Sequence, residues 1–132
     1  MTYEEYEIQE KERLSVNIGH LEHGVRFVDI RAAYIDPEVV IGAGTVIYPG
    51  VVLEGRTVIG ENCVIGQNTN IKDCTLGNGT DIRSSFLTES TVGERTHIGP
   101  FAYLRPGSRI GNDCKVGDFV EIKNSSFGDG TK

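Results

Sequence analysis

The sequence has 132 residues, enough for one domain, and its 13 Lys and Arg against 19 Asp and Glu give a formal net charge of −6. A chain of this charge with no basic cluster is not expected to bind nucleic acid, because nucleic-acid phosphates are neutralised by grouped Lys and Arg. No apolar run approaches the roughly 18 residues that span a membrane, and no signal peptide is evident, so we expect a cytoplasmic protein with no membrane partner.

The first residues differ in character from the rest of the chain. Thr2 and Glu5 have the spacing of a capping box, and Glu7 and Lys11 form an i,i+4 pair of favourable polarity. We predict a short exposed helix over residues 1–13, acidic on balance and with a thin apolar stripe.

The chain between the helix and the main pattern is transitional. The VRFV segment at 25–28 predicts a strand that starts the first, irregular coil. We therefore divide the chain into an N-terminal helix and linker, 1–24, and a second domain, 25–132.

A repeat of six residues dominates the chain from Ile35 to Phe127. A large apolar residue opens each repeat, and every step is six residues except four steps of five. The opening positions are Ile35, Ile41, Ile47, Leu53, Ile59, Ile65, Ile71, Leu76, Ile82, Leu87, Val92, Ile98, Leu104, Ile110, Val116, Ile122 and Phe127. Two residues before each later opener stands a small or narrow side chain, and the short steps keep this second rule.

A period of six fits neither an α-helix nor an isolated amphipathic strand. It is typical of a hexapeptide-repeat parallel β-helix, in which three short strands complete a coil of about 18 residues and successive coils stack at about 4.8 Å. The large and small positions would both point inward. The sequence therefore predicts an all-β fold, a parallel β-helix of hexapeptide repeats with a short N-terminal helix.

The cysteines and histidines indicate no metal site. Cys63, Cys74 and Cys114 all fall on small inward positions, which predicts buried reduced thiols, and an odd count without a CxxC motif disfavours disulfides and zinc. No two histidines recur one coil apart, which disfavours a metal enzyme. We expect His97 to face solvent, and His20 and His23 to lie in a loop. The glycines of GAGTVIYPG lie within the repeat and indicate turns, not a phosphate loop.

The segment IGPFAYLRPGSRIGNDCKVGDFVEIK, residues 98–123, is more specific than the repeats. It closely resembles the acetyltransferase half of the bacterial bifunctional enzyme that makes UDP-N-acetylglucosamine, which reads IGPFA-x-LRPG and VG-x-FVE-x-K. The resemblance covers about residues 14–132. It implies a left-handed coil, a homotrimer, a cytoplasmic role in supplying cell-wall peptidoglycan precursors, and transfer of acetyl from acetyl-CoA to glucosamine 1-phosphate.

Two site residues follow from this resemblance. Arg105 matches the arginine of LRPG and Lys123 the lysine of FVE-x-K, and in the family both bind the phosphate of glucosamine 1-phosphate. Each directly follows an inward opener, Leu104 or Ile122, and the openers between them keep steps of six. The two cations are therefore expected one coil apart, about 5 Å between Cα atoms.

Other parts of the family pattern are missing. The Gly-rich nucleotide loop of the pyrophosphorylase half, which uses Mg²⁺, does not occur, and the family's general-base histidine would follow Lys132. His97 matches no family catalytic position. Because base catalysis needs a base within hydrogen-bond reach, we expect a truncated domain, by design or in the gene, without catalytic residues, metal or a cofactor of its own.

Two alternatives remain open. The chain could be a non-catalytic hexapeptide-repeat scaffold or trimerisation module, or an acyltransferase for another sugar or for serine, which LRPG and FVEIK together disfavour. An uncovered last coil exposes strand edges, so we also expect higher oligomers or aggregation unless that end is covered.

Overall fold

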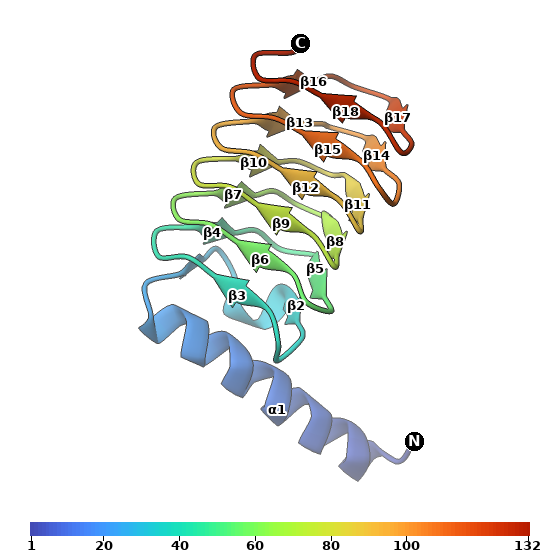
Figure 1. Cartoon of the computed structure of the whole chain (residues 1–132). Coiled ribbons are helices and arrows are strands. Elements are labelled where there is room, and N and C mark those ends of the chain that lie inside the picture. Colours follow the sequence, from blue (N-terminus) through green and yellow to red (C-terminus); the bar gives the residue numbers. More distant parts are fainter.

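The structure, a computed structural model, describes all residues from 1 to 132 and consists of one helix followed by a three-sided coil of short parallel strands (Figure 1). Followed from the helix upward, the coil is left-handed. The predicted fold, a left-handed parallel β-helix with an N-terminal helix, is confirmed.

Three six-stranded sheets form the sides of the prism, and we name each by its first strand. The β1 sheet holds β1 (Arg26–Phe27), β4 (Val46–Ile47), β7 (Val64–Ile65), β10 (Asp81–Ile82), β13 (His97–Ile98) and β16 (Lys115–Val116). The β2 sheet holds β2 (Ala33–Ile35), β5 (Val51–Glu54), β8 (Asn70–Lys72), β11 (Phe86–Thr88), β14 (Ala102–Leu104) and β17 (Val120–Ile122). The β3 sheet holds β3 (Val40–Ile41), β6 (Val58–Ile59), β9 (Thr75–Leu76), β12 (Thr91–Val92), β15 (Arg109–Ile110) and β18 (Ser126–Phe127).

The interior follows the repeat up to the last coil, where the predicted inward positions Val120, Ser125 and Phe127 are only partly buried. The large openers from Ile35 to Ile122 are buried, and the small positions from Val39 to Cys114 are buried as well. The short steps leave both sets inward: Cys74 and Leu76, after a step of five, are each 2% exposed. Full burial of one such aliphatic side chain contributes about 1.5–3 kcal/mol to folding.

Many of the small inward side chains also donate hydrogen bonds to backbone carbonyls of the next coil. The Thr45 hydroxyl donates to the Gly60 carbonyl at 2.9 Å, and the Thr96 hydroxyl donates to the Gly111 carbonyl at 2.7 Å. Because these carbonyls lie at corners where ladder pairing is interrupted, the hydroxyls satisfy buried backbone groups.

From the corner after β3 onward, each corner holds a residue with left-handed backbone dihedrals. At one corner Gly44 lies under Asn62, and a Cβ on Gly44 would meet the Asn62 side-chain oxygen at 2.1 Å. Glycine is thus required there by close approach, and its φ of +81° is one that glycine adopts readily. The interpretation of GAGTVIYPG as turn-forming is confirmed.

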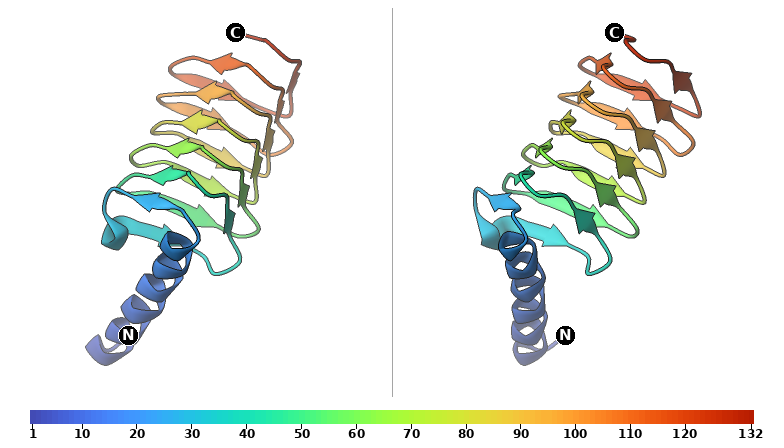
Figure 2. Two further views of the ribbon diagram at one scale, coloured as in Figure 1. Left: turned by 90° about the vertical axis from the view of Figure 1, so that its left-hand side faces the viewer. Right: turned by 60° about the vertical axis from the view of Figure 1, so that its left-hand side comes forward.

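The N-terminal helix, α1 (Tyr3–Glu22), lies beneath the first coil, and its N-terminal part projects beyond the prism (Figure 2). The capping box of Thr2 and Glu5 is formed as predicted. The predicted end at residue 13 is wrong, because the helix continues for nine more residues, to Glu22.

Two polar side chains dock this extension on the coil. Asn17, which is fully buried, donates to the carbonyls of Ile30 and Ala33 at 2.9 and 3.0 Å. Arg13 donates to the carbonyls of Arg31 and Ala33, beside the short 3₁₀ helix η1 (Ile30–Ala32), and lies 4.3 Å from the centroid of the Tyr34 ring. The helix is stabilised by these tertiary contacts, which a propensity argument does not include.

Two smaller predictions at this end are also wrong. Glu7 and Lys11 form no ion pair; the pair that forms is Glu10–Arg13, at 2.7 Å. His20 and His23 lie at the C-terminal end of α1 and not in a loop, and His23 Nδ1 lies 2.7 Å from the Gly19 carbonyl oxygen. None of the helices is both long and apolar enough to cross a membrane.

Candidate functional site

Arg105 and Lys123 lie where the register predicts. Each follows a strand of the β2 sheet, Arg105 after β14 and Lys123 after β17, and the two strands pair with Leu104 opposite Ile122. The Arg105 amide donates to the Ile122 carbonyl at 2.8 Å, so the two cations are stacked one coil apart at the same corner. Their role in binding a substrate stays a prediction.

Local hydrogen bonds fix the backbone of this corner. The Arg105 carbonyl accepts from the hydroxyls of Ser108 and Ser90, at 2.8 and 3.1 Å. Gly107 turns the chain with a φ of +84°, and a Cβ at this position would meet the Asn124 side-chain oxygen at 2.7 Å. The arginine therefore projects from a rigid turn, which reduces the entropy lost when a ligand binds.

Glu121 is the carboxylate nearest to this pair. Its Oε2 lies 3.6 Å from Arg105 Nη1, and both side chains are partly exposed, at 58% and 43%. Lys123 forms no ion pair and is exposed. One guanidinium with a loosely held carboxylate and one free ammonium leave a net positive charge here, in a chain that is negative overall.

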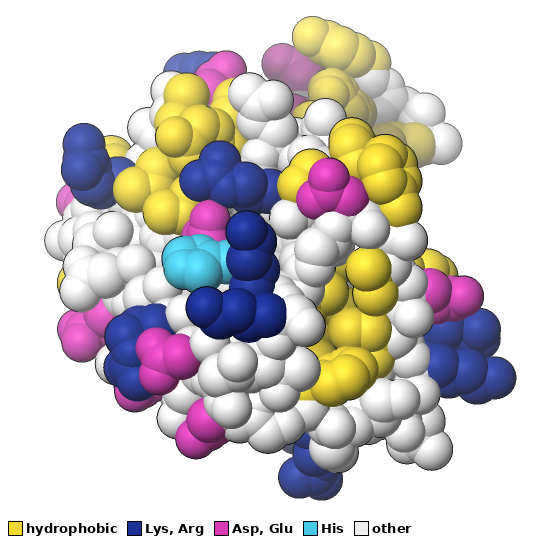
Figure 3. Space-filling view, turned by 90° about the horizontal axis from the view of Figure 1, so that it is seen from above, with side chains coloured by type: hydrophobic (Ala, Val, Ile, Leu, Met, Phe, Trp, Pro, Cys, Tyr) yellow, Lys and Arg dark blue, Asp and Glu magenta, His cyan; other side chains and the backbone are white.

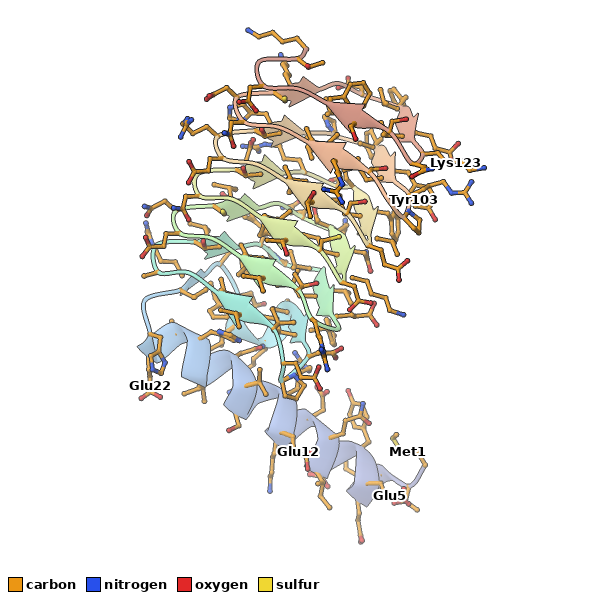
Figure 4. All side chains as sticks on the ribbon, viewed as in Figure 1. Met1, Glu5, Glu12, Glu22, Tyr103 and Lys123 are labelled. Atoms are coloured by element: carbon orange, nitrogen blue, oxygen red, sulfur yellow. The ribbon has the colours of Figure 1, made fainter.

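An aromatic surface adjoins the cations on the same sheet. Tyr103 and Lys123 project from the same edge of the prism (Figure 4), and Tyr103 pairs with Glu121 in the register. The rings of Phe86 and Tyr103 lie 6.3 Å apart and are both exposed. Sequence analysis did not identify Tyr103 or Glu121. Both could have been found, because they lie one coil apart and each stands two residues before a predicted cation.

His97 lies on another side of the prism, in β13 of the β1 sheet. It is 61% exposed, as predicted, but its Nδ1 contacts the Asp81 carboxylate, a partner that was not anticipated. It is not part of the Arg105–Lys123 site. No group of three or more His, Cys, Asp or Glu side chains is placed to hold a metal ion.

The three cysteines are free and buried, as predicted. Burial raises the pKa of the Cys74 thiol to about 11, and it raises that of Cys63 as well. These thiols are therefore neutral at physiological pH and act as small apolar side chains.

The fold and the relatives together define the class of the chain: it is an acetyltransferase-type domain built from hexapeptide repeats. The chain belongs to the family described as GMPPB C-terminal domain, which matches residues 35–128.

The bifunctional protein GlmU supplies similar curated relatives. The chain is 48% identical to GlmU of Clostridioides difficile (strain 630) over 120 residues, which is 91% of this chain and 26% of that protein. It is 53% identical to GlmU of Geobacillus sp. (strain WCH70) over 113 residues, 86% of this chain and 25% of that protein. The resemblance identified from LRPG and FVE-x-K is confirmed, and the chain spans about a quarter of the length of these relatives.

A solved structure supports the same class. The H141A mutant of GDP-perosamine N-acetyl transferase from Caulobacter crescentus, in complex with CoA and GDP-perosamine, has a TM-score of 0.74 and 26% identity. The match covers 92% of this chain and 60% of that one.

Proposed function

We propose that the chain is part of a glucosamine-1-phosphate N-acetyltransferase in which Arg105 and Lys123 bind the phosphate of glucosamine 1-phosphate. The observation that carries this proposal is the stacking of two cations, one coil apart, on a rigid corner of a chain that is about half identical to GlmU proteins. In that reaction the sugar amine attacks the thioester of acetyl-CoA, and the Caulobacter enzyme likewise binds CoA.

Electrostatics favour an anion between the two side chains. Two unit charges about 5 Å apart repel by about 1 kcal/mol in water and by about 3 kcal/mol at an effective dielectric of 20. A phosphate group relieves this repulsion and accepts charge-assisted hydrogen bonds from both cations. The guanidinium presents a planar fork of donors and the ammonium acts as a point charge, so the two contribute differently.

We assign phosphate binding to Arg105 and Lys123 and no step of the acetyl transfer. No histidine lies beside Arg105, because His97 projects from the β1 sheet and the other two histidines end α1. Proton removal from the sugar ammonium needs a base within about 3 Å, directly or through one water. We therefore assign no catalytic residue, and acetyl-CoA enters as the co-substrate of the full reaction.

The setting proposed for this activity is a cytoplasmic homotrimer that supplies precursors of the cell wall, with residues 25–132 as the acetyltransferase domain and residues 1–24 as its helix and linker. The high identity to GlmU proteins supports this over a non-catalytic scaffold.

Isothermal titration of the full chain with glucosamine 1-phosphate tests the proposal. We expect millimolar binding that Arg105→Gln and Lys123→Gln each weaken by about tenfold or more, the cost of one charge-assisted hydrogen bond. Lys72→Gln is the matched control, because Lys72 lies on the same sheet and pairs with Glu54 and Thr88. Equal binding by all three variants would refute the site.

An acetyl-transfer assay tests the second part. With glucosamine 1-phosphate and acetyl-CoA we expect no release of free thiol above background. If the wild-type chain turns over and Arg105→Gln abolishes the turnover, the chain must contain a catalytic base. The proposed phosphate site would stand in that case.

A further inference from the structure

The corner between the β1 and β2 sheets contains a hollow. The residues that follow the β1-sheet strands form one column, joined by backbone bonds such as Gly66 N to the Ile82 carbonyl and Arg83 N to the Ile98 carbonyl. From the second coil to the last, this column reads Tyr48, Gly66, Arg83, Gly99 and Gly117. Of the five positions in this column, only Tyr48 and Arg83 therefore carry a side chain.

The glycine between the two side chains leaves a polar hollow. A Cβ on Gly66 would approach the Arg83 side chain at 3.2 Å, so any larger residue would press on it. The hollow is lined by Tyr48, Gly66, Gln67, Arg83, Ser84 and Pro100. Apart from the proline and the tyrosine ring, its walls offer amide, hydroxyl and guanidinium groups.

Asp81 holds two neighbouring side chains beside this hollow. Its Oδ2 accepts from Arg83 Nε at 3.1 Å, and its Oδ1 contacts His97 Nδ1. Asp81 is only 18% exposed, whereas Arg83 and His97 are each 61% exposed. Both carboxylate oxygens are thus occupied, and the two partners keep free groups facing solvent: the terminal guanidinium nitrogens and imidazole Nε2.

Lys115 adds a cation one coil above His97. The register pairs Asp81 with His97 and His97 with Lys115, so the three side chains project from one column about 4.8 Å apart. Lys115 is exposed and forms no ion pair. Arg95, two residues before His97, is paired with Asp113 and Glu94.

The local charge is therefore positive. Arg83 and Lys115 outweigh the single, partly exposed carboxylate of Asp81, although the whole chain has a net charge of −6. Seen from above, a histidine lies among Lys and Arg side chains with a carboxylate beside it (Figure 3).

We propose that Arg83, His97 and Lys115 form a second anion site, which binds the phosphate of a small phosphate monoester. The uncharged polar part of the ligand would lie in the hollow between Tyr48 and Arg83. Arg83 and Lys115 supply charge-assisted donors on two sides of His97, and imidazole Nε2 accepts from a protonated phosphate oxygen, because the Nδ1 proton faces Asp81. A phosphate offers three free oxygens to these three groups where a carboxylate offers two, and Asp81 orients the guanidinium and imidazole in advance. The site is on a different sheet from Arg105 and Lys123 and does not depend on the function proposed for them.

Nuclear magnetic resonance of the full chain at constant pH tests the proposal with inorganic phosphate as the probe. We expect saturable shifts of the His97 imidazole and the Lys115 amide. Arg83→Gln and Lys115→Gln should each weaken binding by about tenfold, as expected for a lost charge-assisted contact. Arg95→Gln, a nearby exposed arginine engaged elsewhere, and Arg105→Gln should leave these shifts unchanged.

Two results would overturn the site: no saturable His97 shift at about 50 mM phosphate, a concentration that would still reveal binding of under 2 kcal/mol, or wild-type binding by both variants. Glucose 1-phosphate then tests the hollow. It should bind more tightly than inorganic phosphate, and Gln67→Ala should reduce that advantage without changing the binding of inorganic phosphate. Equal binding of the two ligands by the wild-type chain would refute the role of the hollow.

Discussion

The interior of the prism and its outer columns obey different rules. Inside, one large and one small position recur through the coils, and the short steps do not disturb them. Outside, the columns that carry charged groups change from coil to coil, as in the column of Glu54, Lys72, Thr88, Arg105 and Lys123. The fold is therefore encoded redundantly, because every repeat supplies the same inward residues. Each functional side chain on the outside is encoded by a single residue.

The corner residues show the same contrast. The positions Gly50, Asn68, Ser84, Phe101 and Phe119 share a left-handed backbone, and their φ values lie between +45° and +81°. Gly and Asn suit this conformation, but a bulky residue there costs about 1 kcal/mol or more. The two phenylalanine rings stack at 5.3 Å and remain 56% and 80% exposed. At this corner the two bulky residues stand in the coils that also carry Arg105 and Lys123.

A cavity in the interior should have the largest effect. Leu53→Ala, at a fully buried position, should lower the free energy of unfolding by about 2–5 kcal/mol, measured by urea denaturation. The matched outer change Val40→Ala, at a residue 56% exposed, should cost about 0.5 kcal/mol or less. Equal losses would mean that the interior is not the stabilising core.

Loss of the Asn17 hydrogen bonds that hold α1 on the first coil should have the next largest effect. Asn17→Ala removes the side-chain donor of the Ile30 carbonyl and leaves the Ala33 carbonyl with Arg13 alone. It should cost about 1–3 kcal/mol, with faster amide exchange confined to α1 and the first coil. Lys11→Ala, on the exposed side of the same helix, is the control. Unchanged amide exchange in the Asn17 variant would show that these hydrogen bonds do not hold the helix on the coil.

The buried thiols should make stability depend on alkaline pH. Burial raises the pKa of Cys74 from 9.0 to about 11, so the folded chain holds its thiol proton more tightly than the unfolded chain does. This contribution is fully present below about pH 9, is lost as the pH rises towards 11, and should be absent in Cys74→Ala. A wild-type loss of stability no steeper than that of the variant between pH 9 and 11 would contradict it.

The smallest effect concerns the outer carboxylate at the candidate site. Glu121→Gln frees Arg105 from its exposed ion pair, which is worth about 0.2–1 kcal/mol, and should tighten glucosamine 1-phosphate binding up to about fivefold. Asp118→Gln, on the same coil, should have no effect. Weaker binding by the Glu121 variant would mean that this carboxylate contacts the sugar.

The sequence predicted the features that depend on period alone. Leu104 and Ile122 could be placed opposite each other by counting steps, and this stacked Arg105 on Lys123 correctly. It did not predict the end of α1, because Asn17 bonds carbonyls 13 and 16 residues away that only the folded coil presents.

The contact of His97 with Asp81 was missed for a similar reason. Two short steps lie between them, so their offset is 16 residues where 18 is usual. The period of the repeat also does not specify where a flexible outer side chain points, so the Arg105–Glu121 contact could not be predicted from the sequence.

The central claim is that the Arg105–Lys123 corner binds the sugar phosphate, and amide shift mapping with glucosamine 1-phosphate tests it most directly. The account predicts that the largest saturable shifts fall on Arg105, Lys123 and their neighbours, and that Arg105→Gln removes them while Lys72→Gln does not. Shifts confined to the β1 sheet, or none at any accessible concentration, would contradict it.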